Sequence, residues 1–88
     1  MAKSKATPIL RDLQIFMLAA NTRNFSVTAE QIGMTHAAVS KSVKRLELAF
    51  GAKMFERTGR GVALTMTGQS VYQYSKTVDD LINVIHAK

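Results

Sequence analysis

The chain lacks several features that mark common classes of protein. Its 88 residues contain no cysteine, which excludes a disulfide framework and metal sites built from thiolates. The apolar stretch from Ile9 to Ala20 is too short to span a bilayer, and Arg11, Asp12 and Gln14 interrupt it. No apolar segment follows the basic residues near the start, and no internal repeat is present. We therefore expect a cytoplasmic protein with room for one globular domain.

Acidic residues are scarce as well. Six acids stand against twelve lysines and arginines, which gives a net charge of +6. Such an excess indicates a polyanionic partner, either nucleic acid or an anionic membrane surface. It is concentrated between residues 35 and 61, where six basic residues accompany two acidic ones. A charge run is often a solvated face, so the pattern within this stretch has to decide its role.

The only proline marks the start of a first helix. Thr7 can cap it, and Pro8 fits the first helical position, where a missing N–H costs nothing. Apolar residues then recur at helical spacing up to the break at 21–24. They form one stripe: Leu10, Leu13, Phe16, Met17 and Ala20.

A helix-turn-helix pattern follows. Ser26 can cap a short second helix that ends at Gly33, because glycine adopts the left-handed conformation without penalty. Thr35 can cap a third helix, which runs to about Phe50 and is closed by Gly51. The tight connection between the two helices is typical of this motif. We expect three core residues here: Phe25, just before the cap, and Val27 and Ile32.

The third helix has two distinct faces. One side is an apolar stripe for the core, formed by Val39, Val43, Leu46 and Phe50. The opposite side is basic, carries small residues at its N-terminal end and contains no acid: His36, Ala37, Ser40, Lys41 and Lys44. Small residues let a helix approach base edges, and the polar ones can bond to bases and phosphates. Glu47 falls between the faces, where it could pair with a neighbouring basic side chain.

Two short runs around a glycine-rich loop predict a β-hairpin. Residues 53–57 and 62–65 flank the loop at 58–61. Arg60 stands between two glycines, so a thin loop tip would expose it to a phosphate or a minor groove. An ordinary surface hairpin with a solvated arginine explains the same pattern equally well.

The last helix, capped by Thr65 and reaching about His86, carries an apolar seam spaced 3, 4, 3, 4. The seam consists of Val71, Tyr74, Val78, Leu81 and Ile85. It could pack on its own domain, but residues 1–65 offer too little surface for so long a stripe. We therefore favour dimerisation.

Enzymatic chemistry has little support in the chain. His36 and His86 lie in different helices, and Asp79 and Asp80 are adjacent, so their carboxylates diverge on a helix. The loop at 58–61 has too few glycines, and no following lysine, for a nucleotide-binding loop. The sequence predicts no enzyme, no metal and no cofactor. Two rivals to nucleic-acid binding stay open: a protein-interaction module with incidental basic charge, and a membrane-surface protein.

Together these motifs resemble the N-terminal DNA-binding region of a LysR-type transcriptional regulator. Four stretches carry the resemblance, 13–20, 24–32, 38–47 and 55–65, and the last two are highly specific in this order and distance. The resemblance implies a mainly α fold: a winged helix-turn-helix over residues 1–65 and a linker or dimerisation helix over 66–88. It also implies a recognition helix (36–49) in the major groove, a wing (53–65) at the minor groove, and a homodimer on an interrupted dyad of double-stranded DNA.

The family's functional positions can be carried over to this chain. The base-reading residues would be His36, Ala37, Ser40 and Lys41, with Thr35 at the helix start. Arg60 would reach the minor groove, while Lys44, Arg45 and Arg57 would face phosphates. Family members commonly have glutamine and proline where this chain has His36 and Ala37, so we expect different preferred bases. Full-length members continue into an effector domain that is absent here, so an effector ligand would act only through that domain.

Overall fold

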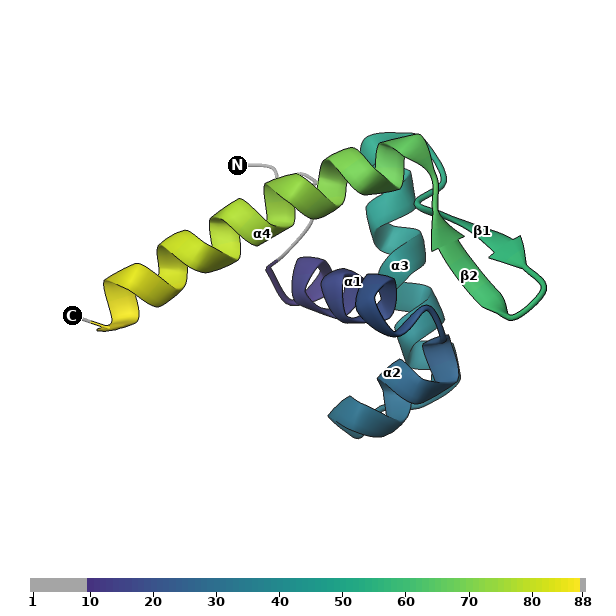
Figure 1. The fold of residues 1–88 in the computed structure, drawn as a ribbon. Helices are drawn as coiled ribbons and strands as arrows, with labels where there is room; N and C mark the ends of the chain where they lie inside the picture. Colours follow the sequence, from purple (N-terminus) through teal and green to yellow (C-terminus); the bar gives the residue numbers. More distant parts are fainter. Residues whose placement is uncertain (1–9, 88) are drawn as a thin grey trace, which may run out of the picture.

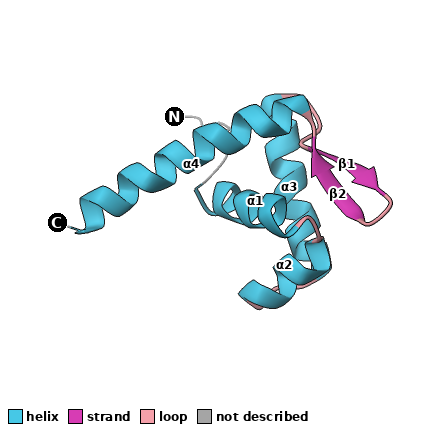
Figure 2. Cartoon of the chain, viewed as in Figure 1, coloured by secondary structure: helices cyan, strands magenta, loops and turns pink. Residues whose placement is uncertain are grey.

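The computed structural model describes residues 10–87, which form four helices and a two-stranded antiparallel sheet (Figure 1). The elements are α1 (Leu10–Thr22), α2 (Phe25–Ile32), α3 (His36–Phe50), β1 (Phe55–Thr58), β2 (Gly61–Leu64) and α4 (Met66–Ala87). Helices dominate, and the hairpin projects from one side as a wing (Figure 2). The predicted mainly α, winged helix-turn-helix fold with a long last helix is confirmed. The helix start predicted at Thr7 and Pro8 lies outside the described residues.

The turn between α2 and α3 follows the predicted end signals. Gly33 adopts the left-handed conformation (φ 68°) and ends α2. Thr35 then caps α3, its Oγ1 accepting the N–H of Ala38 at 3.0 Å. Gly51, also left-handed (φ 67°), closes α3. These local signals are confirmed because caps and left-handed glycines act within a few residues of chain.

The predicted cap of α2 is wrong. Asn24, not Ser26, occupies that position, and its Oδ1 accepts the N–H of Val27 at 3.0 Å. The cause lies one residue earlier, where Arg23 turns the chain with a left-handed φ of 58°. Asparagine caps a helix as well as serine does, so the helix begins as soon as the turn allows. Ser26 therefore lies in the first turn of α2.

The larger of two buried apolar clusters joins the helices to the base of the wing. Phe16 of α1, Leu46 of α3 and Met54 before β1 are fully buried. The ring of Phe55 in β1 lies 5.5 Å from that of Phe16 and 5.3 Å from that of Phe25, measured between centroids. The wing is thus attached to α1 and α2 by aromatic packing.

Three residues expected in the core or in an apolar stripe are 38–40% exposed: Leu10, Val27 and Phe50. Val27 of α2 is 39% exposed, because this short helix packs through Thr28 and Ala29 on its opposite side. Leu10 and Phe50 are the first residue of α1 and the last of α3, and both are partly outside the core. A helical pattern assigns a face, but the ends of a helix can extend past the core that covers the face.

The wing is a tighter hairpin than predicted. Thr58 pairs with Gly61, so the loop expected at 58–61 is a two-residue turn, Gly59-Arg60. Gly61 has a φ of 154°, and a Cβ there would lie 2.2 Å from the carbonyl oxygen of Arg23. The same carbonyl accepts the N–H of Val62 at 3.1 Å. Glycine lets β2 press against the α1–α2 turn, which fixes the direction of the wing.

Helix α4 has two parts with different surroundings. Thr65 caps it as predicted, accepting the N–H of Gly68 at 2.9 Å. Val71, 4% exposed, and the buried Ser75 then belong to the domain core. The inclusion of Val71 in an exposed dimer seam is therefore wrong, because α1 and the base of the wing already cover it. The core continues past residue 65, and the later turns of α4 project beyond the other elements (Figure 1).

No helix in the described range is long and apolar enough to cross a membrane.

Candidate nucleic-acid interface

Helix α3 divides into a buried face and an exposed face, as its pattern predicted. Val39, Val43 and Leu46 are buried against the other elements. The predicted DNA-facing residues share the other side: Thr35, His36, Ala37, Lys41 and Lys44 are exposed, and Ser40 is half-buried. The structure thus brings these six residues together on one side of α3, and none of them is acidic.

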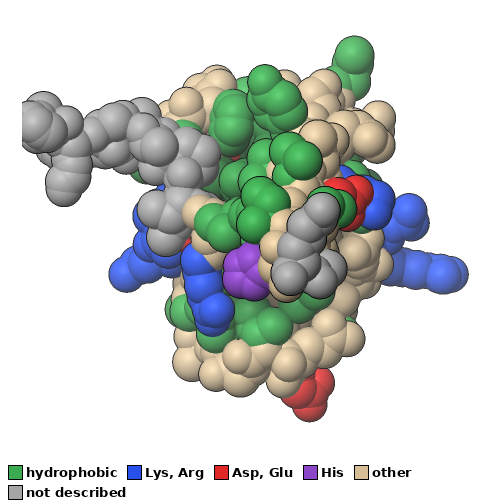
Figure 3. Space-filling model, turned by 90° about the vertical axis from the view of Figure 1, so that its left-hand side faces the viewer, with side chains coloured by type: hydrophobic (Ala, Val, Ile, Leu, Met, Phe, Trp, Pro, Cys, Tyr) green, Lys and Arg blue, Asp and Glu red, His purple; other side chains and the backbone are tan. Residues whose placement is uncertain are grey.

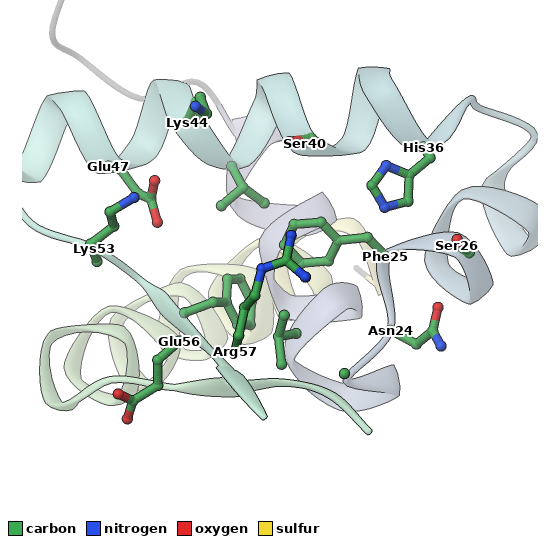
Figure 4. Close-up of a pocket in the computed structure, with 14 residues that line it drawn as sticks. Asn24, Phe25, Ser26, His36, Ser40, Lys44, Glu47, Lys53, Glu56 and Arg57 are labelled. Carbon is green, nitrogen blue, oxygen red and sulfur yellow. The ribbon is translucent and has the colours of Figure 1, made fainter. Parts of the chain in front are cut away.

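A groove of about 330 Å³ separates α3 from the wing (Figure 4). Its walls come from the start of α2, one side of α3, β1 and the start of β2. Three basic side chains line the groove, those of Lys44, Lys53 and Arg57. Two acidic residues, Glu47 and Glu56, line it as well. Figure 4 shows Arg57 reaching from β1 across the groove, whereas Glu56 points out of it.

Lys53 is a groove residue that sequence reasoning did not single out. It precedes β1 in the segment between α3 and the wing, where no periodic pattern assigns a direction to a side chain. Asn24 and Ser26, at the start of α2, also line the groove; the sequence assigned Ser26 only a capping role and placed Asn24 in the break after the first helix. The one available signal was the position of Lys53 within the basic stretch 35–61.

Glu47 joins α3 to the strand of the wing. Its Oε2 accepts the backbone N–H of Met54 at 2.9 Å. The sequence suggested a basic side chain as its partner, but this backbone amide takes that place. The hydrogen bond fixes the C-terminal half of α3 to the segment that leads into β1, so Glu47 helps to set the width of the groove.

His36 lies at the other end of the groove, against an aromatic ring. Its imidazole centroid is 6.0 Å from that of Phe25, at an interplanar angle of 49°. Phe25 also packs on Phe55 of β1, so one ring supports both the start of α3 and the wing. His36 is exposed on its remaining side and available to a ligand.

A buried carboxylate links α1 to α3. Asp12 is 2% exposed, and its Oδ1 accepts the hydroxyl of Ser42 at 2.6 Å. Arg45 donates from Nη2 to Oδ1 at 2.9 Å and from Nε to Oδ2 at 3.0 Å. Burial acts to raise the pKa of Asp12, but the hydrogen bonds from Arg45 and Ser42 and the charge of Arg45 hold it below its ordinary value. The carboxylate is ionised in the folded protein at neutral pH.

Sequence reasoning missed this link, although a signal was present. Asp12 shares its helix face with Ile15, Phe16 and Ala19, at spacings of three, four and seven residues. An acid on a buried face needs a basic partner, because an unpaired buried charge is costly. The sequence does not show which basic residue pairs with Asp12, since Arg45 is 33 positions away.

The two arginines of the wing occupy different places. Arg60 lies in the turn at the tip of the hairpin, as predicted, and its backbone N–H donates to Thr58 Oγ1 at 3.3 Å. Arg57 lies on β1, facing the groove. Both are exposed. The wing therefore presents one positive charge at its tip and one beside α3.

The distal part of α4 carries uncovered apolar side chains. Tyr74, Val78, Leu81 and Ile85 of the predicted seam are exposed, as is Val84, and Leu81 is 58% exposed. An apolar pocket of about 210 Å³ continues the seam between α1, the end of α3 and α4. Figure 3, which faces the side where α4 ends, shows hydrophobic side chains gathered at the centre and top of this face.

Known proteins with similar sequences are regulators. Residues 10–69 match the family described as bacterial regulatory helix-turn-helix proteins of the lysR family. The chain is 37% identical over 76 residues, 86% of its length, to an uncharacterised HTH-type transcriptional regulator of Methanocaldococcus jannaschii, covering 26% of that protein. It is 35% identical over 71 residues, 81% of its length, to the HTH-type transcriptional regulator DmlR of Escherichia coli, covering 23% of it.

Solved structures agree on the fold. OxyR of Corynebacterium glutamicum in its oxidised form superposes with a TM-score of 0.85 at 26% identity, over all of this chain and 28% of OxyR. The DNA-binding domain of CbnR, in its complex with DNA, superposes with a TM-score of 0.83 at 22% identity, over 90% of this chain and 91% of that one. At this identity the second likeness shows the fold alone.

The extent of these matches sets what they establish. The chain spans about a quarter of the length of the curated relatives that it matches. The family match covers more than two thirds of the chain, from α1 to the first turn of α4. The chain therefore belongs to the lysR family of bacterial regulatory helix-turn-helix proteins.

Proposed function

We propose that this chain binds double-stranded DNA in a sequence-specific manner, as the DNA-binding part of a transcriptional regulator. The observation that carries the proposal is the acid-free, basic outer face of α3, set beside a cation-lined groove and a wing with an arginine at its tip. A polyanion matches this charge pattern, and a helix with small side chains at its start fits a major groove. Catalysis is no part of this function, and its setting is the cytoplasm.

The outer face of α3 reads bases in this proposal. Ala37 leaves room for close approach, while His36, Ser40 and Lys41 present donors and acceptors to base edges. Thr35 stands at the N-terminal end of the helix, where it is exposed. The contacts that specify sequence are thus concentrated in the first two turns of α3.

The groove beside α3 receives one sugar-phosphate strand. In B-DNA a strand of phosphates separates the major groove from the minor groove. A domain with α3 in the major groove and Arg60 at the minor groove therefore has one strand across the space between them. Lys44 and Arg57 line that space and supply phosphate contacts, which position the domain and make its affinity depend on salt. The third residue of the expected phosphate-facing set, Arg45, is bonded to Asp12 and is considered separately below.

The exposed seam of α4 pairs two copies of the chain. Tyr74, Val78, Leu81 and Ile85 form an apolar strip that its own protomer leaves uncovered. A second copy can cover such a strip, as in a coiled coil. Pairing would fix the distance between two α3 helices, so that the dimer reads an interrupted dyad. An effector ligand would act through a region of the regulator outside this chain.

Selection of bound duplexes from a random DNA pool, at near-physiological salt, tests this function. We expect enrichment of a motif with two related halves separated by an unread spacer. The variant Ser40→Ala should lose discrimination on the order of 1–3 kcal/mol at one base position in each half. Ser70→Ala, which removes an exposed hydroxyl from α4, is the matched control and should select the unchanged motif. Salt-sensitive binding without any enriched motif would contradict specific recognition and favour a basic interaction module.

A further inference from the structure

The role of Arg45 follows from what its guanidinium already contacts. Nε and Nη2 both donate to the carboxylate of Asp12, at 3.0 and 2.9 Å, so the planar group is held side-on in a two-bond geometry. The side chain is 55% exposed, and its charge lies at the edge of the DNA-facing side. Within residues 10–87 it forms the only salt bridge. A positive charge on the recognition helix is thus bound within the protein.

The acceptor side of this pair is enclosed. Asp12 is buried, and Ser42, which donates to the same carboxylate at 2.6 Å, is fully buried. No side-chain nitrogen or oxygen buried among the described residues lacks a hydrogen-bond partner, so every buried polar atom of the cluster is engaged. Movement of Arg45 toward a phosphate would leave a buried carboxylate with only the hydroxyl of Ser42, which is strongly unfavourable.

The cluster holds α3 on the flank that faces away from the wing. At 100° per residue, Ser42 and Arg45 lie on one edge of the core stripe, and Glu47 lies near the other. Glu47 is bonded to the N–H of Met54 beside the wing, so directional hydrogen bonds fasten α3 on both flanks. Burial of Val39, Val43 and Leu46 keeps this face of α3 packed against the core, but apolar packing is not directional. The rotation of α3 about its axis therefore depends on the polar contacts.

We propose that Arg45 is a positioning residue for base readout: together with Ser42 and Asp12 it fixes the rotation of α3, and it is not one of the phosphate contacts. This proposal rests on the proposed function, because it concerns the same DNA-reading face. A small rotation of α3 would displace His36, Ser40 and Lys41 from base edges while leaving the surface charge almost unchanged. Arg45 thus acts on discrimination between sequences, and Lys44 acts on overall affinity.

Binding of purified variants to two duplexes distinguishes these roles. One duplex carries the motif selected by the unaltered chain, and the other is random; both are titrated over a range of salt concentrations, at a temperature where circular dichroism shows each variant to be folded. For Arg45→Ala we expect the dissociation constant for random DNA, divided by that for the selected motif, to fall about tenfold. A loss of this size is comparable to the cost of one mismatched base pair in the site. The salt slope on random DNA should stay the same, because no phosphate contact is lost.

Two further variants sharpen the test. Arg45→Lys keeps the charge but lacks the planar two-bond donor, so it should also fail to restore discrimination. Lys44→Ala is the matched control, because it removes one charge from the neighbouring position without touching Asp12. It should lower the salt slope by about 0.9 for each bound protomer and weaken binding to both duplexes equally.

A third variant separates positioning from stability. The triple variant Asp12→Leu, Ser42→Ala, Arg45→Met removes the polar cluster while keeping apolar packing. Its thermal stability should therefore be largely retained. Discrimination should still be reduced, since the directional contacts are gone. Full discrimination in this folded triple variant overturns the positioning role.

The remaining outcomes are equally decisive. If Arg45→Ala weakens both duplexes equally and lowers the salt slope by about 0.9 for each bound protomer, Arg45 is a phosphate contact and the proposal is wrong. Full rescue by Arg45→Lys leads to the same conclusion. If the unaltered chain selects no motif at all, the proposed function itself fails, which is a different result from a motif that Arg45→Ala still reads.

Discussion

Helices α3 and α4 are both amphipathic, yet they bury their apolar stripes in different ways. The stripe of α3 (Val39, Val43, Leu46) is enclosed within its own protomer, and hydrogen bonds hold the helix on both flanks. The stripe of α4 enters the same core only near its start and is then left exposed. Helical periodicity thus shows that a face is apolar, but it does not show whether the same chain or another one covers it.

The two helices therefore differ in how firmly their orientation is held. A reading helix must have a fixed orientation, because base contacts tolerate little displacement. Helix α3 meets that requirement with enclosed packing and directional bonds. The distal part of α4 has neither within the protomer, so its position depends on whatever covers Leu81 and its neighbours.

The largest difference is expected between truncations of the two stripes. Leu46→Ala creates a cavity beneath α3, where the side chain is fully buried, and should lower the free energy of unfolding by about 2–5 kcal/mol. That loss should not depend on protein concentration, as measured by denaturant unfolding. Leu81→Ala should leave the unfolding of the domain nearly unchanged at concentrations low enough for a monomer. Equal losses in the two variants would mean that α4 is enclosed by its own protomer.

A charge in the α4 seam should act on association instead of folding. Leu81→Glu would place a carboxylate in the proposed dimer contact and should weaken association by about 2 kcal/mol or more. Sedimentation should then show monomers at concentrations where the unaltered chain is dimeric, while circular dichroism still shows a folded, helical protein. Asn83→Glu adds the same charge to an exposed position outside the seam and should stay dimeric. Dimers of Leu81→Glu would show that the seam is not the contact.

The smallest expected effect concerns acid. The pKa of Asp12 is lower in the folded chain than in the unfolded one, so its contribution to stability is present above the ordinary carboxyl pKa and is lost as pH falls through the folded value. Asp12→Asn should therefore cost about 1–2 kcal/mol at neutral pH, and this difference should shrink below about pH 4. Denaturant unfolding from pH 7 to pH 2 measures it. A difference that does not change with pH would show that Asp12 is not charged in the fold.

Some parts of the interface could be predicted from local sequence. The cap at Thr35, the left-handed Gly33 and the arginine at the wing tip depend on neighbours a few residues away, and their predicted positions are confirmed. The predicted cap at Ser26 failed because Arg23, a residue with no glycine-like signature, adopts the left-handed turn. The assignment of Val71 to the dimer seam was wrong because α1 and the base of the wing, which are distant in the chain, bury this side chain within its own protomer.

The sequence by itself determined the kind of protein: its helices, its basic outer face on α3, its glycine-flanked arginine and its long apolar seam. These follow from periodicity and local backbone chemistry, which act over one or two turns. Only the tertiary structure decided which groups meet: Asp12 with Arg45, Glu47 with the amide of Met54, and Gly61 with the carbonyl of Arg23. Such contacts join residues many positions apart, and their energies depend on burial and on angstrom-scale geometry that no local pattern specifies.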